Sequence, residues 1–200
     1  VIGEYAFAGT AVSQFKLNSA NTYLTLGENG AMVYSASTGE LLLVAPNYGS
    51  VGKALTIEAD TIAAGAFAGN TRITSVIAPN ATYVGAYAFA DCKNLRIVTM
   101  PNVEEIGEYA FANTAISQTP DLTHTTVIGA YAFAYTQLTD VTIAAQTEIG
   151  EYAFAYCNSL ESVTVGDGAV IGAYAFYSPV YLFTYEATGN MDCLLYTSPS

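Results

Sequence analysis

Phenylalanine recurs along this chain at an almost constant interval, and this interval constrains the fold more than any other feature. The repeated phenylalanines are Phe7, Phe67, Phe89, Phe111, Phe133, Phe154 and Phe176. After a first gap of 60 positions, the spacings are 22, 22, 22, 21 and 22. Each phenylalanine lies in a copy of one motif, for example IGEYAFANT, IGAYAFAYT or IGEYAFAYC. Units this short cannot bury a hydrophobic face alone, so we expect them to stack on one another.

An apolar triplet follows the motif in most copies, with two residues and then one residue between its members. The triplets are Val12, Phe15 and Leu17; Ile73, Val76 and Ala78; Leu95, Val98 and Met100; Leu138, Val141 and Ile143; Leu160, Val163 and Val165; and Val180, Phe183 and Tyr185. The alternation at the end of each triplet predicts a short strand with one buried face. A period of 21 or 22 also falls within the range of about 20 to 29 residues of leucine-rich repeats. The sequence therefore predicts a β-rich leucine-rich-repeat solenoid with stacked parallel strands.

Two segments depart from this pattern. Ile116 is followed by Thr119 and Asp121, and Pro120 lacks a ladder donor, so we expect a bulge or a broken strand there. Residues 18–61 interrupt the period with three β-rich runs separated by GENG and SASTG, which predicts an inserted antiparallel β-meander. Within this segment, LTI at residues 55–57 resumes the stacking.

The expected organisation of the chain follows from these boundaries. We assign a partial N-terminal repeat (1–17), the meander and its return to the repeat (18–61), the stacked coils (62–185) and a tail (186–192). The chain starts without a methionine, so we expect a fragment. The last eight residues, CLLYTSPS, resemble a translated sequencing adapter, so we expect residues 193–200 to be read-through rather than native.

Each position of the motif has an expected structural role. The phenylalanine is the inward plug, and the alanine before it lets the backbone approach closely. A glycine precedes the motif in six copies, at a tight corner that a Cβ would crowd. Only the coil at Ala63 lacks it, with Gly65 displaced two places along. The following residues fit about one turn, so we predict short helical or 3-10 corners.

The position three residues after each phenylalanine holds small polar or thiol side chains. They are Thr10, Asn70, Cys92, Thr114, Thr136, Cys157 and Pro179. We expect a hydrogen-bonded column under a turn. Cys92 and Cys157 lie three coils apart, roughly 14 Å at ~4.8 Å per strand, whereas a disulfide needs Cα atoms within about 7 Å. Both are predicted to be free thiols.

No catalytic, metal-binding or cofactor-binding site is predicted. His124, the only histidine, has no nucleophile or metal-ligand spacing near it. The GDG at residues 166–168 lacks the spaced carboxylates of a calcium loop and predicts a plain turn. The glutamate of the motif, as in Glu108 and Glu151, is replaced by alanine in other coils, so we interpret it as solvated charge rather than a general acid. The segment is predicted not to be an enzyme.

Charge and hydropathy exclude two classes of partner. Five Lys or Arg stand against 17 Asp or Glu, and the net charge of −12 repels nucleic-acid phosphates and anionic membrane surfaces. No apolar run approaches the roughly 18 to 20 residues of a membrane span, so no membrane insertion is expected.

Two rows of side chains are candidate binding surfaces, because a solenoid presents equivalent positions of successive coils side by side. The outward positions of the strands are Ser75, Ile77, Ile97, Thr99, Gln118, Pro120, Asp140, Thr142, Ser162 and Thr164. The second row lies two residues before each phenylalanine, with Tyr87, Tyr109, Tyr131, Tyr152 and Tyr174. These tyrosines either seal the corner or form an aromatic strip for protein or carbohydrate contacts. Tyr135 and Tyr156 lie on another column.

The copies of LESVTVGDGAVIGAYAF resemble leucine-rich repeats of the BspA type, over essentially all of residues 1–185. The family implies a secreted or cell-surface protein that adheres to a protein ligand, such as an extracellular matrix or host surface protein. It supplies no shared binding residues to transfer to this chain. Two functions stay open: an adhesive, non-catalytic protein-binding module, or a passive spacer that positions another domain, which could be an enzyme.

Overall fold

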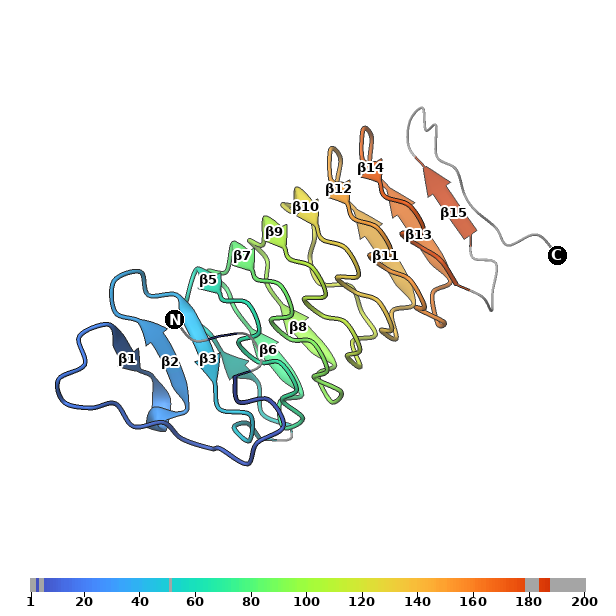
Figure 1. The fold of residues 1–200 in the computed structure, drawn as a ribbon. Coiled ribbons are helices and arrows are strands. Elements are labelled where there is room, and N and C mark those ends of the chain that lie inside the picture. Colours follow the sequence, from blue (N-terminus) through green and yellow to red (C-terminus); the bar gives the residue numbers. More distant parts are fainter. Residues whose placement is uncertain (1–2, 4–5, 51, 179–183, 188–200) are drawn as a thin grey trace.

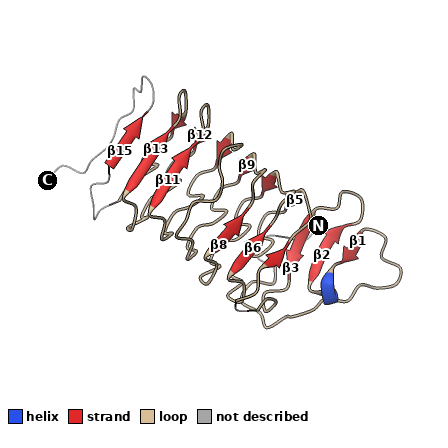
Figure 2. Ribbon diagram, turned by 180° about the vertical axis from the view of Figure 1, so that it is seen from behind, coloured by secondary structure: helices blue, strands red, loops and turns tan. Residues whose placement is uncertain are grey.

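The computed structural model describes residues 3, 6–50, 52–178 and 184–187. Within these ranges the chain forms an elongated stack of coils, with the meander at one end and the last strand at the other (Figure 1). Strands run along two faces of the stack, and turns join them (Figure 2). The predicted leucine-rich-repeat solenoid is confirmed.

Five of the six apolar triplets contribute to the predicted parallel strands, which lie in two separate sheets. One sheet contains β4 (Leu55–Thr56), β6 (Ser75–Ile77) and β8 (Ile97–Thr99). The other contains β11 (Asp140–Ile143), β13 (Ser162–Val165) and β15 (Thr184–Ala187). The strands pair without offset, so residues of the same repeat position are neighbours, as Val76 is to Val98. The four triplets that begin at Ile73, Leu95, Leu138 and Leu160 are all buried.

A further sheet, with nine strands, was not predicted. Six of its strands are two-residue strands just before each corner and follow one another along the stack, and the other three belong to the meander. The two-residue strands are β5 (Thr61–Ile62), β7 (Tyr83–Val84), β9 (Glu105–Ile106), β10 (Val127–Ile128), β12 (Glu148–Ile149) and β14 (Val170–Ile171). Each strand is too short to show a period in the sequence, and only stacking in register makes it part of a sheet.

The predicted meander forms one end of this nine-stranded sheet. Its strands are β1 (Leu24–Leu26), β2 (Met32–Ser35) and β3 (Leu41–Val44), which pair antiparallel in sequence order. A 3-10 helix, η1 (Glu28–Gly30), lies between β1 and β2. Leu41 of β3 pairs in parallel with Ile62 of β5. The meander thus covers the edge of the stack that the first coils would otherwise leave open.

The corners are successive turns rather than the predicted helical or 3-10 corners. In one coil, Ala88, Ala90 and Cys92 donate their N–H groups to carbonyls three residues back. The alternating residues Tyr87 and Phe89 donate instead to the next coil, to Glu108 and Ala110. Left-handed φ values at the tyrosines interrupt any helix, and the alternation ties neighbouring coils together at every second residue.

Five of the six corner glycines lie where a Cβ cannot fit, as the sequence predicts, whereas a Cβ on Gly3 would have nothing within 4 Å. A Cβ on Gly129 would lie 2.6 Å from the nitrogen of Glu108 and 2.7 Å from the carbonyl carbon of Gly107, both in the preceding coil. Gly65 has a different role from the one expected. It occupies the position of the tyrosine in later coils, with a φ of +67°, where glycine adopts the left-handed conformation without strain.

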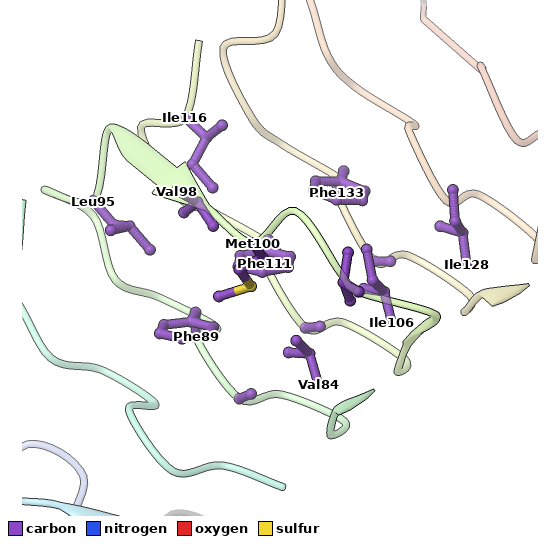
Figure 3. Close-up of a cluster of buried hydrophobic side chains, with 14 of the residues drawn as sticks. Val84, Phe89, Leu95, Val98, Met100, Ile106, Phe111, Ile116, Ile128 and Phe133 are labelled. Atoms are coloured by element: carbon purple, nitrogen blue, oxygen red, sulfur yellow. The ribbon is translucent and has the colours of Figure 1, made fainter. Parts of the chain in front are cut away.

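The phenylalanines form one buried column through the stack, which confirms the plug assignment for six of them. Phe67, Phe89, Phe111, Phe133, Phe154 and Phe176 are at most 9% exposed. Consecutive rings lie 4.6 to 5.2 Å apart with nearly parallel planes. Figure 3 shows Phe89, Phe111 and Phe133 among the aliphatic side chains of the two strand faces.

The small polar column is hydrogen-bonded, and its cysteines are free and buried, as predicted. Thr114 donates its hydroxyl to the Phe111 carbonyl at 2.9 Å. The Cys157 thiol lies 3.2 Å from the Phe133 carbonyl oxygen and 3.1 Å from the Thr136 hydroxyl. Pro179 lies outside the described residues.

The coil with Pro120 has no strand on the triplet face, so the predicted break is confirmed. Ile116 is buried and Gln118 is exposed, as predicted, but the rest of the side-chain assignment is wrong. Pro120 and Leu122 are buried, while Thr119 is half-buried and Asp121 is exposed. Ile116 precedes Ile128 by 12 positions, whereas Leu95 precedes Ile106 by 11. The segment between these two apolar residues is therefore one residue longer in this coil, and its buried positions are Pro120 and Leu122 instead of Thr119 and Asp121.

The first repeat departs from the prediction. Residues 11–18 form no strand, and Val12, Phe15 and Leu17 are only half-buried. Phe7 packs edge-on against Phe15 at 5.2 Å, and its ring is half-buried. The segment bonds to the meander, through Phe15 N–H to Gly30 and Asn47 N–H to Val12, which explains why it does not complete a coil. Of the last triplet, residues 180 and 183 lie outside the described residues.

Candidate binding surfaces

The triplet face presents the predicted outward side chains in rows. Thr99, Asp140, Thr142, Ser162 and Thr164 are exposed, Ile77 and Ile97 are 37% and 57% exposed, and Ser75 is half-buried. The rows are in register: Asp140 pairs with Ser162, and Thr142 with Thr164. The strandless coil divides this face into an N-terminal part on β6 and β8 and a C-terminal part on β11 and β13 (Figure 1).

Polar contacts link the C-terminal part of the face to the strandless coil. Thr139 donates its hydroxyl to the Asp140 carboxylate at 2.9 Å. Thr119, in the strandless coil, donates to the Asp140 carbonyl oxygen. These contacts hold the Asp140 carboxylate in the same row as Ser162, beside the row of Thr142 and Thr164.

The predicted tyrosine row is a continuous stack of five rings, which we call the tyrosine ladder: Tyr87, Tyr109, Tyr131, Tyr152 and Tyr174. Consecutive ring centroids lie 4.9, 4.6, 4.9 and 5.0 Å apart, and the planes differ by at most 13°. Four of the rings are half-buried, and Tyr174 is 42% exposed. The ladder therefore packs along the corner and also reaches solvent.

A second tyrosine column lies beside the ladder. Tyr135 is 54% exposed and stacks on Tyr156 at 4.6 Å. Tyr177 joins the two columns, because its ring packs edge-on against both Tyr156 and Tyr174. Together the columns form one aromatic surface on the corner edge of the stack.

All five ladder tyrosines adopt the left-handed conformation, with φ between 53° and 57°. This conformation costs roughly 1 kcal/mol for a residue with a Cβ, and the coil with Gly65 shows that glycine fills the same place. Stacked aromatic pairs contribute about 0.5 to 1.5 kcal/mol beyond their buried area. The stacking of the ladder thus offsets the strain of its backbone.

The three inner tyrosines of the ladder have phenol pKa values above the ordinary range. Burial raises the pKa of Tyr109, Tyr131 and Tyr152, and neighbouring tyrosines and glutamates raise it further. Glu108 acts on Tyr109, while Glu151 acts on both Tyr131 and Tyr152. At neutral pH the hydroxyl groups are therefore protonated and can donate hydrogen bonds.

A third row, on the sheet of two-residue strands, was missed from the sequence. It consists of Tyr83, Glu105, Val127, Glu148 and Val170, which are exposed and in register. The sequence did contain a pattern that could have predicted this row. Each corner glycine follows an Ile or Val, and the residue before that Ile or Val varies between coils. In this row, the variable residue is the exposed one.

The residues set aside as non-catalytic have structural contacts. His124 Nδ1 lies 3.1 Å from the carbonyl oxygen of Pro101 in the preceding coil. Asn80 and Asn102 donate to carbonyls in the same way, at Glu58 and Pro79. Among residues 3, 6–50, 52–178 and 184–187, no three His, Cys, Asp or Glu side chains come together as metal ligands would. In the same ranges no helix is long and apolar enough to cross a membrane.

Comparison with known proteins identifies the repeat. Six copies of the BspA type leucine rich repeat region match residues 60–182. The fold is similar to that of a leucine-rich repeat protein from Bacteroides ovatus ATCC 8483, with a TM-score of 0.51 and 19% identity. This match covers 82% of the present chain and 50% of the other, so the chain spans half the length of that protein. No curated protein matches the sequence. The chain, with its repeated corner motif and in-register strands, belongs to the BspA-type leucine-rich repeat family.

Proposed function

We propose that this chain is a non-catalytic protein-binding module of a secreted or cell-surface protein, and that it adheres to an extracellular matrix or host surface protein. The membership in a repeat family of surface and interaction modules supports this proposal. The binding surface is the triplet face, with Ser75, Ile97 and Thr99 in its N-terminal part.

One observation carries the proposal: the exposed side chains of β11 and β13 lie in register. Asp140 is beside Ser162, and Thr142 is beside Thr164, all exposed on a rigid pair of strands. Fixed rows of hydroxyl groups with one carboxylate can hydrogen-bond a partner without first being ordered. A surface that is already ordered loses less entropy on binding than a flexible one.

The test is binding of the chain to a panel of immobilised extracellular matrix proteins, measured by biolayer interferometry. Replacing Asp140, Thr142, Ser162 and Thr164 together by lysine is expected to abolish binding. The matched control carries four lysines at exposed positions of the sheet of two-residue strands, and it changes the net charge equally: Tyr83, Val127, Glu148 and Val170. If the triplet-face variant binds as tightly as the parent chain, the triplet face is not the binding surface.

The alternative is a passive spacer that positions another domain of a longer protein. The close fit between coils favours it, because a stack joined by hydrogen bonds at every corner keeps its two ends at a fixed separation. Failure of the parent chain to bind any protein of the panel would favour this spacer over the adhesive module.

A further inference from the structure

The tyrosine ladder presents an unusual kind of aromatic surface. Each inner ring is stacked between two others, so the ring faces are covered, and the ring edges are the parts left to reach solvent. A sugar ring or a flat aromatic ligand binds aromatic side chains mainly through their faces. The inner rungs of the ladder are therefore better suited to a ligand that lies along it and touches ring edges and hydroxyl groups.

Carboxylates flank the ladder at every second rung. Glu108 and Glu151 are exposed and directly precede Tyr109 and Tyr152, whereas alanine holds the same position at residue 130 between them. Two rungs correspond to about 10 Å at ~4.8 Å per strand. Because Glu151 raises the pKa of both Tyr131 and Tyr152, its charge lies close to the ladder.

The surrounding charge is acidic and unopposed. Residues 97–178 contain nine Asp or Glu and no Lys or Arg. Glu104, Glu105 and Glu148 are exposed on or beside the strands that lead into the corner. A partner that lies on this surface must carry positive charge, and its cations gain most when they meet the two flanking carboxylates.

The spacing of the carboxylates selects the conformation of the partner. A polyproline II helix has three residues per turn and a rise of about 3.1 Å, so every third side chain points the same way at intervals of roughly 9.3 Å. In an extended β-strand, residues three apart point to opposite sides. An α-helix could match the spacing at every seventh residue, about 10.5 Å, but its carbonyl groups are already bonded. The carbonyl groups of polyproline II are open to phenol donors.

We propose that the tyrosine ladder, with Glu108 and Glu151, binds a polyproline II segment of a protein partner that carries Lys or Arg at every third position. The cations pair with the carboxylates, their aliphatic stems pack on ring edges, and the tyrosine hydroxyls donate to segment carbonyls. This inference rests on the proposed protein-binding function and names a partner chemistry for a surface separate from the triplet face.

The test uses a fluorescein-labelled peptide with four Pro-Pro-Lys repeats, whose binding to the whole chain is followed by fluorescence anisotropy. A second peptide has the same composition with lysine at irregular intervals, and a third is helical with lysine at every seventh position. We expect the regular peptide to bind most tightly, and its affinity to fall as salt is raised.

Variants locate the site. Glu108→Gln with Glu151→Gln is expected to weaken binding roughly two- to thirtyfold, as the loss of two exposed ion pairs implies. The matched control, Glu161→Gln with Asp167→Asn, removes two exposed carboxylates elsewhere and should leave the affinity unchanged. Tyr131→Phe keeps the ring stack and should weaken binding through the lost hydroxyl.

Equal affinity for the regular and irregular peptides, tighter binding of the helical peptide, or equal losses in the two carboxylate pairs would overturn the inference. No binding of any peptide would do the same. The proposed function is judged separately. If the triplet-face variant loses binding to matrix proteins while the Glu108 and Glu151 variant keeps it, that result would support the proposed function and show that matrix proteins do not bind through the ladder.

Discussion

Removing one phenylalanine ring from the middle of the stack is the most direct probe of what holds the coils together. Phe111 is fully buried, and its ring lies 5.1 Å from Phe89 and 5.2 Å from Phe133, with planes tilted by 4° and 11°. In Figure 3 the three rings follow one another through the core. Phe111→Ala therefore removes contacts with the coil before it and the coil after it.

The expected cost is about 3 to 5 kcal/mol, the range found for phenylalanine to alanine changes in protein cores. Relaxation cannot recover much of this cost, because hydrogen bonds between coils hold the backbone on both sides of the cavity. Phe111 N–H donates to Ala132 at 2.7 Å, and Phe89 N–H donates to Ala110 at the same distance. At roughly 2 to 4 °C per kcal/mol for a chain of this size, the Tm should fall by about 6 to 20 °C.

Thermal and urea unfolding, followed by both circular dichroism and tyrosine fluorescence, measure this change. Two probes are needed because repeat arrays can unfold in parts, and only coincident transitions justify a single free energy of unfolding. Thr142→Ala, at an exposed position of β11, is the surface control and should change stability by no more than about 0.5 kcal/mol. If the two variants shift the Tm equally, the phenylalanine column is not what joins the coils.

Four further predictions concern the corner glycines, the ladder tyrosines and the buried thiols. Gly129→Ala should destabilise the chain by about 1 to 3 kcal/mol in urea unfolding, because its Cβ would meet the preceding coil at 2.6 Å; Gly3→Ala, with nothing within 4 Å of its Cβ, should have little effect. Tyr131→Ala should be less stable than Tyr131→Gly by about 1 kcal/mol, since both lose the ring and only alanine keeps the left-handed strain; the reverse order would contradict the strain argument. Burial raises the pKa of the Cys92 and Cys157 thiols, so peptide mapping after iodoacetamide treatment at pH 8 should find both unmodified in the folded chain and modified in urea. Because the unfolded chain releases these protons above about pH 9 and the folded chain keeps them, the two thiols leave stability unchanged below that pH and lower it above. The fall above pH 9 should be less steep in Cys92→Ala, and an equal slope in the variant would count against this cause.

The features that repeat at every coil were predictable from the sequence. The buried phenylalanines, the apolar triplets and the corner glycines each recur at one position, so a single physical explanation covers six phenylalanines, five glycines and four buried triplets. The free cysteines followed from the same period, since the number of coils between Cys92 and Cys157 sets their separation. The register of the exposed triplet-face residues was predictable for this reason too.

Features that depend on contacts between coils were not predictable. The left-handed tyrosines gave no local signal, because their strain is offset only by rings in the neighbouring coils. The two-residue strands, such as Glu105–Ile106, become a sheet only when stacked. Val12 to Leu17 carry the triplet pattern but form no strand, since the meander rather than a coil lies beside them.

The strandless coil has a practical consequence for protein engineering. It has lost its strand and gained a residue between Ile116 and Ile128, yet its corner, its phenylalanine and its place in the stack are unchanged. Chain length can therefore vary on this side of a coil without disturbing the hydrogen bonds of the corners. Residues 117–119, half-buried or exposed and unpaired in any strand, offer a graft site at which a foreign peptide would be displayed between two rigid sheets.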